Sequence, residues 1–161
     1  MGIEGTPVLD VLRQQLPPVD PRSLAGTACL GLPGRPESVR SAREFTRSTL
    51  HGWRLPEQFD AVGLVVSELV TNALRHGVRT RPAAAGRLRA SVELELMRCS
   101  RRLVCAVRDP GEAVPRLGRP DCSAESGRGL QLVESFSDAW GWRPLSGERP
   151  GKVVWAAFRT C

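Results

Sequence analysis

The sequence predicts an α+β two-layer sandwich, in which a mixed, largely antiparallel sheet carries its helices on one face. Two amphipathic helical patterns follow one another early in the chain, at residues 36–52 and 56–76. Two strand patterns come next, and the short connection around residues 100–102 is typical of an antiparallel hairpin. A third helix and a second strand pair complete the chain. This order favours helices and strands in separate layers.

The first half of the predicted domain contains one strand and two helices. A short apolar run at residues 28–32 ends at a Pro-Gly pair, which indicates a first strand. The helix at residues 36–52 begins with Pro36, and proline is favoured in the first turn of a helix. The helix at residues 56–76 has one apolar stripe and ends at Gly77, as expected of a glycine just past a helix end.

The second half contains two predicted strand pairs separated by a helix. Residues 89–97 alternate between apolar and polar side chains, which is typical of a half-buried strand. Residues 103–107 form a more continuous apolar run, which is typical of a central strand. A helix is predicted at residues 127–136, and two closing strands at residues 140–143 and 153–158.

Length and composition are those of a soluble chain with one domain. The chain has 161 residues, of which 41% are hydrophobic and 25% charged, so it can form a single core. Residues 1–26 are rich in proline, and we expect them to form a flexible arm before a domain at residues 27–161. The sequence shows neither a membrane-spanning run nor a signal peptide, so we expect a cytoplasmic protein without a membrane partner.

The cysteine pattern argues against a disulfide framework and against a zinc site. The five cysteines are odd in number and contain no Cys-x-x-Cys pair. Cys29, Cys99 and Cys105 lie in or beside predicted strands, where we expect them to be buried as small hydrophobic residues.

The basic charge of the chain indicates acidic partners. The net charge is +6 and the isoelectric point is near 9.9, which favours nucleic acid, nucleotide phosphates or an acidic protein as ligands. The excess is almost entirely arginine, tyrosine is absent, and no aromatic residues alternate with the arginines to form a stacking platform. A nucleic-acid-binding module is therefore an alternative that only the charge supports.

Three polar side chains line up along the helix predicted at residues 56–76. Glu68, Asn72 and His76 are four residues apart, so they are expected to stack on one face beside the apolar stripe. A carboxylate, an amide and an imidazole would then stand at the edge of the core, where a cleft wall would lie. The polar edge of any amphipathic helix can carry such residues, so this pattern alone leaves both interpretations open.

A second candidate position is the end of the predicted central strand. Asp109 is followed by Pro110 and Gly111. A carboxylate there can accept a hydrogen bond from an exocyclic amine, and a glycine lets a ligand approach the backbone closely. The same Asp-Pro-Gly triplet is also common in simple tight turns.

A third candidate position is the start of the helix predicted at residues 127–136. Gly127 and Gly129 flank Arg128, and Leu130 follows. Exposed backbone N–H groups and the helix dipole make such a helix start a natural phosphate site.

The three positions together resemble a known pattern. In order, Glu-x-x-x-Asn, Asp-x-Gly and Gly-x-Gly resemble the N, G1 and G2 boxes of the GHKL (Bergerat-fold) ATPases, a superfamily that includes histidine kinases, gyrase B and MutL. The resemblance covers residues 28–158. Because extra domains are absent, the chain is most similar to the anti-sigma-factor serine/threonine kinases of bacteria.

The resemblance implies ATP and Mg2+ as cofactors and assigns a role to each candidate residue. Glu68 corresponds to the catalytic base, and Asn72 to the ligand of Mg2+. Asp109 corresponds to the residue that reads the adenine amine. The remaining nucleotide-binding positions are Gly111, Gly127, Arg128, Gly129 and Leu130. The family often has a threonine in the last strand that helps hold this aspartate, and we align that threonine with Val153.

The implied function is regulatory. Proteins of this type bind a sigma factor and phosphorylate a serine on a small antagonist protein. The resemblance also allows a homodimer formed through the first strand and helix. The main alternative is a non-catalytic switch, in which ATP orders a lid at residues 112–126 and a partner protein recognises the ordered lid.

Overall fold

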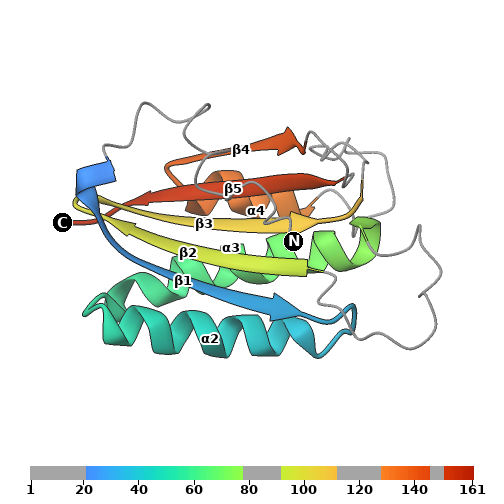
Figure 1. The fold of residues 1–161 in the computed structure, drawn as a ribbon, viewed down its shortest axis with the longest axis horizontal. Helices are drawn as coiled ribbons and strands as arrows, with labels where there is room; N and C mark the ends of the chain where they lie inside the picture. The colour runs from blue at the N-terminus through green and yellow to red at the C-terminus, as the bar shows by residue number, and fades with distance from the viewer. Residues whose placement is uncertain (1–20, 78–91, 112–127, 146–150) are drawn as a thin grey trace, which may run out of the picture.

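A five-stranded sheet with three helices packed on one face forms the fold (Figure 1). The computed structural model describes residues 21–77, 92–111, 128–145 and 151–161. In chain order the elements are η1 (Pro21–Ser23), β1 (Leu24–Leu32), α2 (Ser38–Gly52), η2 (Pro56–Gln58), α3 (Phe59–Asn72), η3 (Ala73–Gly77), β2 (Val92–Cys99), β3 (Arg102–Asp109), α4 (Arg128–Phe136), β4 (Ala139–Pro144) and β5 (Lys152–Arg159).

The sheet has the strand order β1-β2-β3-β5-β4, and each neighbouring pair is antiparallel. The predicted α+β two-layer sandwich is confirmed. We expected a mixed, largely antiparallel sheet, and the strands within the described ranges contain no parallel pair. β2 and β3 form the predicted hairpin, and β3 is the central strand of the sheet, as predicted.

The first strand is longer than its hydrophobic run. β1 begins at Leu24 instead of residue 28, because its small residues pair with β2 from the Leu24–Cys99 register onward, with an irregularity between Leu24 and Gly26. Residues 24–26 therefore belong to the sheet and not to the expected arm. Residues 1–20, like the predicted lid at residues 112–126, lie outside the described parts of the chain.

α3 is the central helix of the helical layer. It packs against both α2 and α4 and lies against the sheet. Its buried apolar residues face one continuous core shared by the three helices and the sheet. These residues are Val62, Val65, Val66, Leu69 and Val70. Among the described helices, none is long and apolar enough to cross a membrane.

The sheet buries apolar side chains on both of its faces. Side chains alternate along a strand, so Leu103, Cys105 and Val107 of β3 face the helices, while Val104 and Ala106 face the other way. A second buried cluster forms on this outer face. Its members are Met97, Val104, Ala106, Val153, Trp155 and Ala157.

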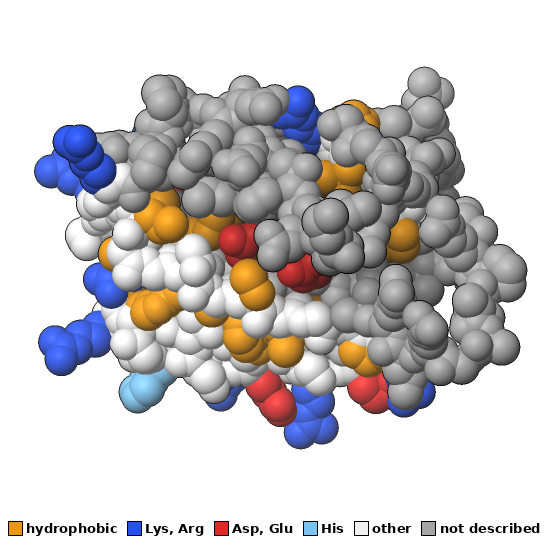
Figure 2. All heavy atoms as spheres, viewed as in Figure 1, with side chains coloured by type: hydrophobic (Ala, Val, Ile, Leu, Met, Phe, Trp, Pro, Cys, Tyr) orange, Lys and Arg blue, Asp and Glu red, His pale blue; other side chains and the backbone are white. Residues whose placement is uncertain are grey.

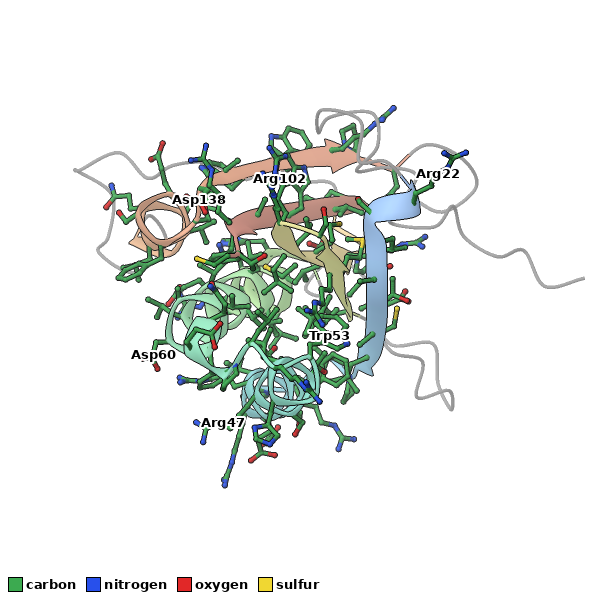
Figure 3. All side chains as sticks on the ribbon, turned by 90° about the vertical axis from the view of Figure 1, so that its left-hand side faces the viewer. Arg22, Arg47, Trp53, Asp60, Arg102 and Asp138 are labelled. Atoms are coloured by element: carbon green, nitrogen blue, oxygen red, sulfur yellow. The ribbon has the colours of Figure 1, made fainter. Side chains whose placement is uncertain are left out.

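The sheet curves around the helices, and Trp53 fills the junction between α2 and β1 (Figure 3). A Cβ atom placed on Gly26 of β1 would lie 3.1 Å from the indole nitrogen of Trp53. The absence of a side chain at Gly26 therefore lets the indole pack directly on the strand.

Two of the three cysteines expected to be buried are buried. Cys99 at the end of β2 and Cys105 in the middle of β3 are buried, whereas Cys29 is exposed. The prediction for Cys29 is wrong because β1 is an edge strand whose alternation turns this residue to the solvent side.

Glu95 is a partly buried carboxyl group on the outer face of the sheet. It lies opposite Cys29 of β1 and Ala106 of β3, and two residues from Glu93 on the same side of β2. Burial, and then the negative charge of Glu93, raise the pKa of Glu95 from 4.5 to about 7. Figure 2 shows acidic side chains next to hydrophobic ones on the visible face of the molecule.

This raised pKa predicts a pH dependence of stability. The folded protein holds a proton on Glu95 that the unfolded chain has already released, so the free energy of unfolding should fall as the pH rises from 4.5 to about 7. Glu95→Gln should remove this fall and stabilise the protein by about 1 kcal/mol at neutral to alkaline pH, a value reduced for partial exposure.

Denaturant unfolding at several pH values measures the effect. Glu93→Gln is the matched control, and it should remove only the part of the fall that comes from the neighbouring charge. An unchanged pH dependence in Glu95→Gln would mean that another group causes the fall.

Candidate functional site

The polar edge of α3 meets the first turn of α4. Glu68 and Asn72 are half-buried, and both reach the backbone of Gly129. A Cβ atom placed on Gly129 would lie 2.9 Å from Glu68 Oε2 and 3.4 Å from each of Asn72 Nδ2 and Oδ1. The absence of a side chain at Gly129 thus allows a carboxylate, an amide and a helix start to come together. The structure thus brings Gly129 to Glu68 and Asn72, two residues of α3 from which it is distant in the sequence.

The end of α3 departs from α-helical geometry. After Asn72 the helix continues as the π-helical turn η3, which ends at Gly77. A π-helical turn has more residues per turn than an α-helix. The prediction that His76 stacks on the same face as Glu68 and Asn72 is therefore wrong. The His76 side chain is exposed, and in its charged form it lowers the pKa of Asp109.

Asp109 forms a buried ion pair with Lys152. The two residues lie directly opposite each other at the end of β3 and the start of β5, and they are only 2% and 5% exposed. Lys152 Nζ donates a hydrogen bond to Asp109 Oδ1 at 3.0 Å and a longer one to the carbonyl oxygen of Gly111 at 3.3 Å. The N–H of Gly111 donates to the same Oδ1 at 2.8 Å. Asp109, Gly111 and Lys152 therefore form one hydrogen-bonded group.

Burial and the neighbouring groups have opposite effects on the pKa of Asp109. Burial raises the pKa of the Asp109 carboxyl above its usual value. The Lys152 ammonium, the N–H of Gly111 and the charge of His76 act in the opposite direction. Without these partners, a carboxylate at this depth would be costly to ionise.

Gly151 holds the backbone conformation that positions Lys152. Its φ angle is +153°, a value that residues other than glycine rarely adopt. A Cβ atom at this position would collide with the carbonyl oxygen of Asp109. The chain can therefore enter β5 close to the end of β3 only with a glycine at this position.

The alignment of Val153 with the family threonine is wrong. Val153 lies opposite Arg108 and packs, fully buried, in the cluster on the outer face of the sheet. Because side chains alternate along β5, Lys152 is the residue that contacts Asp109. Sequence reasoning missed Lys152. The signal that could have identified it is the Gly-Lys pair at the start of the last strand.

The structure describes some of the remaining predicted site residues. Gly111 and Gly129 are buried, and Leu130 is 3% exposed and contributes its side chain to the interior. The backbone of Arg128 begins α4, but its side chain is outside the described parts of the structure, as is Gly127.

These residues form two groups with different chemistry. The group at Glu68, Asn72 and Gly129 offers carboxylate and amide oxygens beside a helix start, which suits a divalent cation together with phosphates. The group at Asp109 and Lys152 offers hydrogen-bond acceptors and donors in a buried setting, which suits the edge of a base. Both groups fit parts of a nucleotide.

Comparison with protein families gives one match, to a histidine kinase-like ATPase domain, over residues 32–158. This range includes α3, the Asp109–Lys152 pair and α4. A comparison with curated proteins found no match.

Several solved structures match the fold of this chain, among them the following two. One contains the RsbU and RsbW domains of Rv1364c from Mycobacterium tuberculosis, with a TM-score of 0.58 and 16% sequence identity. The similarity covers 84% of this chain and 32% of the other, so this chain spans about a third of that protein. The second is the SiaB–SiaC complex from Pseudomonas aeruginosa, with a TM-score of 0.57, 17% identity, and coverage of 94% of this chain and 98% of the other.

The close approach at Gly129 predicts a variant that impairs the site and keeps the fold. In Gly129→Ala the new methyl group must displace the Glu68 carboxylate, which is the end of a flexible side chain. Alanine also favours the helix more than glycine does, which should offset part of the packing cost. We expect a nearly unchanged free energy of unfolding and an approximately tenfold weaker binding of Mg-nucleotide.

Denaturant unfolding and nucleotide titration of this variant test the prediction. Gly52→Ala is the matched control, because a Cβ atom at Gly52 contacts nothing within 4 Å. Equal nucleotide affinities of Gly129→Ala and Gly52→Ala would remove Gly129 from the site.

Breaking the buried ion pair should destabilise the fold much more than breaking an exposed one. Asp109→Ala leaves the Lys152 ammonium buried without its carboxylate, so it should lower the free energy of unfolding by about 3–5 kcal/mol. Glu44→Ala breaks the exposed Arg40–Glu44 pair, whose side chains are 86% and 69% exposed, and should cost less than about 1 kcal/mol. Similar losses in the two variants, measured by denaturant unfolding, would contradict a structural role for the buried pair.

Proposed function

The chain belongs to the family of histidine kinase-like ATPase domains, and from this we propose that it is an ATP-dependent anti-sigma-factor kinase. It would bind a sigma factor and phosphorylate a serine on a small antagonist protein. The observation that supports the proposal most is the contact of Glu68 and Asn72 with Gly129 at the start of α4.

Asn72 and the first turn of α4 are proposed to hold the phosphate end of ATP. Magnesium ions usually take few protein oxygens and complete their coordination with phosphates and water, and one amide oxygen at Asn72 fits this sparse role. The backbone N–H groups at residues 128–130, in the first turn of α4, suit the phosphates because the first N–H groups of a helix lack partners within the helix.

Glu68 is proposed to be the catalytic base. It lies one turn before Asn72 on the same edge of α3, so its carboxylate can orient the serine hydroxyl of the antagonist and accept its proton. Phosphoryl transfer depends mainly on positioning and on neutralisation of charge. Mg-ATP supplies the phosphoryl group and part of the neutralising charge when bound.

The protein partners are proposed from the resemblance and from the neighbouring structures. One neighbour was solved as a complex of two proteins, SiaB and SiaC, which supports a role for this fold in binding a protein partner. The sigma factor, the antagonist and a homodimer are proposed on the same basis.

Incubation with labelled ATP, Mg2+ and candidate antagonist proteins from the same genome tests the proposal. Wild-type protein should transfer label to a serine of one antagonist. Glu68→Ala should retain most ATP binding and lose transfer by about 100-fold or more. Asn72→Ala should weaken Mg-dependent ATP binding by about tenfold.

Glu57→Ala, in the short helix η2 before α3, is the matched control for Glu68→Ala and should leave transfer unchanged. Failure of transfer to every antagonist, with ATP still changing the affinity for a partner, would replace the kinase with a non-catalytic switch. Failure to bind ATP would contradict both.

A further inference from the structure

We propose that Lys152 determines base specificity: with Asp109 it presents an acceptor beside a donor, which together recognise the N6 amine and the N1 ring nitrogen of adenine. The inference rests on the proposed function, because it assigns Lys152 to the same nucleotide site. It makes Lys152 a binding residue and not only the counter-ion of a buried carboxylate.

The hydrogen bonds of Asp109 leave one of its oxygens available. Both of its contacts, from Lys152 Nζ and from the N–H of Gly111, go to Oδ1. Within the described residues, Oδ2 receives no hydrogen bond. A carboxylate oxygen of this kind can accept a hydrogen bond from an amine.

The hydrogen bonds of Lys152 likewise leave one N–H available. An ammonium group has three N–H donors. One is used by Asp109 Oδ1 and a second by the carbonyl oxygen of Gly111, and the described parts of the chain offer no third acceptor. Lys152 Nζ and Asp109 Oδ1 are 3.0 Å apart. The available N–H of Lys152 and the available oxygen of Asp109 therefore lie close enough to contact neighbouring atoms of one base.

Adenine matches this arrangement at both positions. Its Watson–Crick edge carries the N6 amine, a donor, next to N1, an acceptor. Guanine in the same orientation carries an acceptor at O6 and a donor at N1, so both contacts would become repulsive. An ammonium can only donate, whereas a threonine hydroxyl can donate or accept. Lys152 therefore selects a ring nitrogen that accepts, more strictly than a hydroxyl would.

The fold holds Lys152 in the geometry that this role needs. A lysine on a surface has many rotamers, but Lys152 is 5% exposed and its ammonium is fixed by two acceptors. Gly151 sets the backbone that directs the side chain toward Asp109. Because the Lys152 side chain is already fixed in the protein, its contact with the base costs no further rotamer entropy on binding.

Competition binding with base analogues tests the proposal on the wild-type protein. The probes are ATP, 1-deaza-ATP, which lacks the N1 acceptor, and purine riboside triphosphate, which lacks the N6 amine. Each displaces a fluorescent ATP analogue in the presence of Mg2+. We expect each deletion to weaken binding by about tenfold or more, because each removes a hydrogen bond to a charged group.

The variant Lys152→Met assigns the N1 contact, because a methionine side chain has no N–H or O–H donor. It should bind ATP and 1-deaza-ATP with nearly equal affinity and should still discriminate against the analogue without the amine. Val153→Thr is the matched control, since its side chain faces the outer cluster, and it should keep the wild-type discrimination. If Lys152→Met does not fold, Asp109→Asn/Lys152→Met replaces two buried charges with neutral groups of similar shape.

Each outcome decides the proposal. Equal binding of ATP and 1-deaza-ATP by wild-type protein would overturn it and leave the proposed function intact. Tighter binding of ATP by Lys152→Met than by wild type would also overturn it, because Lys152 would then obstruct Asp109. Absence of ATP binding by wild-type protein would instead overturn the proposed function, and the inference with it.

Discussion

The buried ion pair between Asp109 and Lys152 is the interaction on which the site and this end of the sheet both depend. Two charges that are 2% and 5% exposed are tolerable only because they neutralise each other and share hydrogen bonds with Gly111. The pair can form only if β3 and β5 keep the register that places Asp109 opposite Lys152. That register requires the positive φ angle of Gly151. The same contacts leave an acceptor and a donor for a ligand.

α3 provides the second constraint, because one helix serves both the core and the site. Its valines and Leu69 are buried in the core, which fixes the rotation of the helix. That rotation turns Glu68 and Asn72 toward α4, where Gly129 allows close contact. The π-helical turn after Asn72 then ends the regular helix against β3, the strand that ends at Asp109. Packing of the core thus positions the polar residues of the site.

The sequence predicted the parts of the fold that depend on local periodicity. The helices at residues 36–52 and 56–76 and the β2–β3 hairpin follow from apolar spacing and turn residues, and the structure has them there. The start of β1 could not be predicted, because Gly26 and Thr27 give no hydrophobic signal and are held by pairing with β2. The exposure of Cys29 depends on which strand forms the edge of the sheet, which is also a property of pairing.

The site was predicted where its motifs are local and missed where it depends on register. Glu68, Asn72 and Gly129 were identified from short patterns, and the structure brings them into contact. Lys152 was missed because its partner Asp109 is 43 residues away in the chain. An alignment error of one residue in β5 exchanges Lys152 for Val153 and so moves the side chain to the opposite face of the sheet.

The most direct test of the account is the location of bound nucleotide. Amide NMR spectra recorded during titration with Mg-ADP resolve glycine signals from each part of the proposed site. If nucleotide binds at this site, the largest shifts should occur at Gly111, Gly129 and Gly151, while Gly52 at the end of α2 remains unchanged. Shifts confined to α2 and β1, with the three site glycines unaffected, would contradict it.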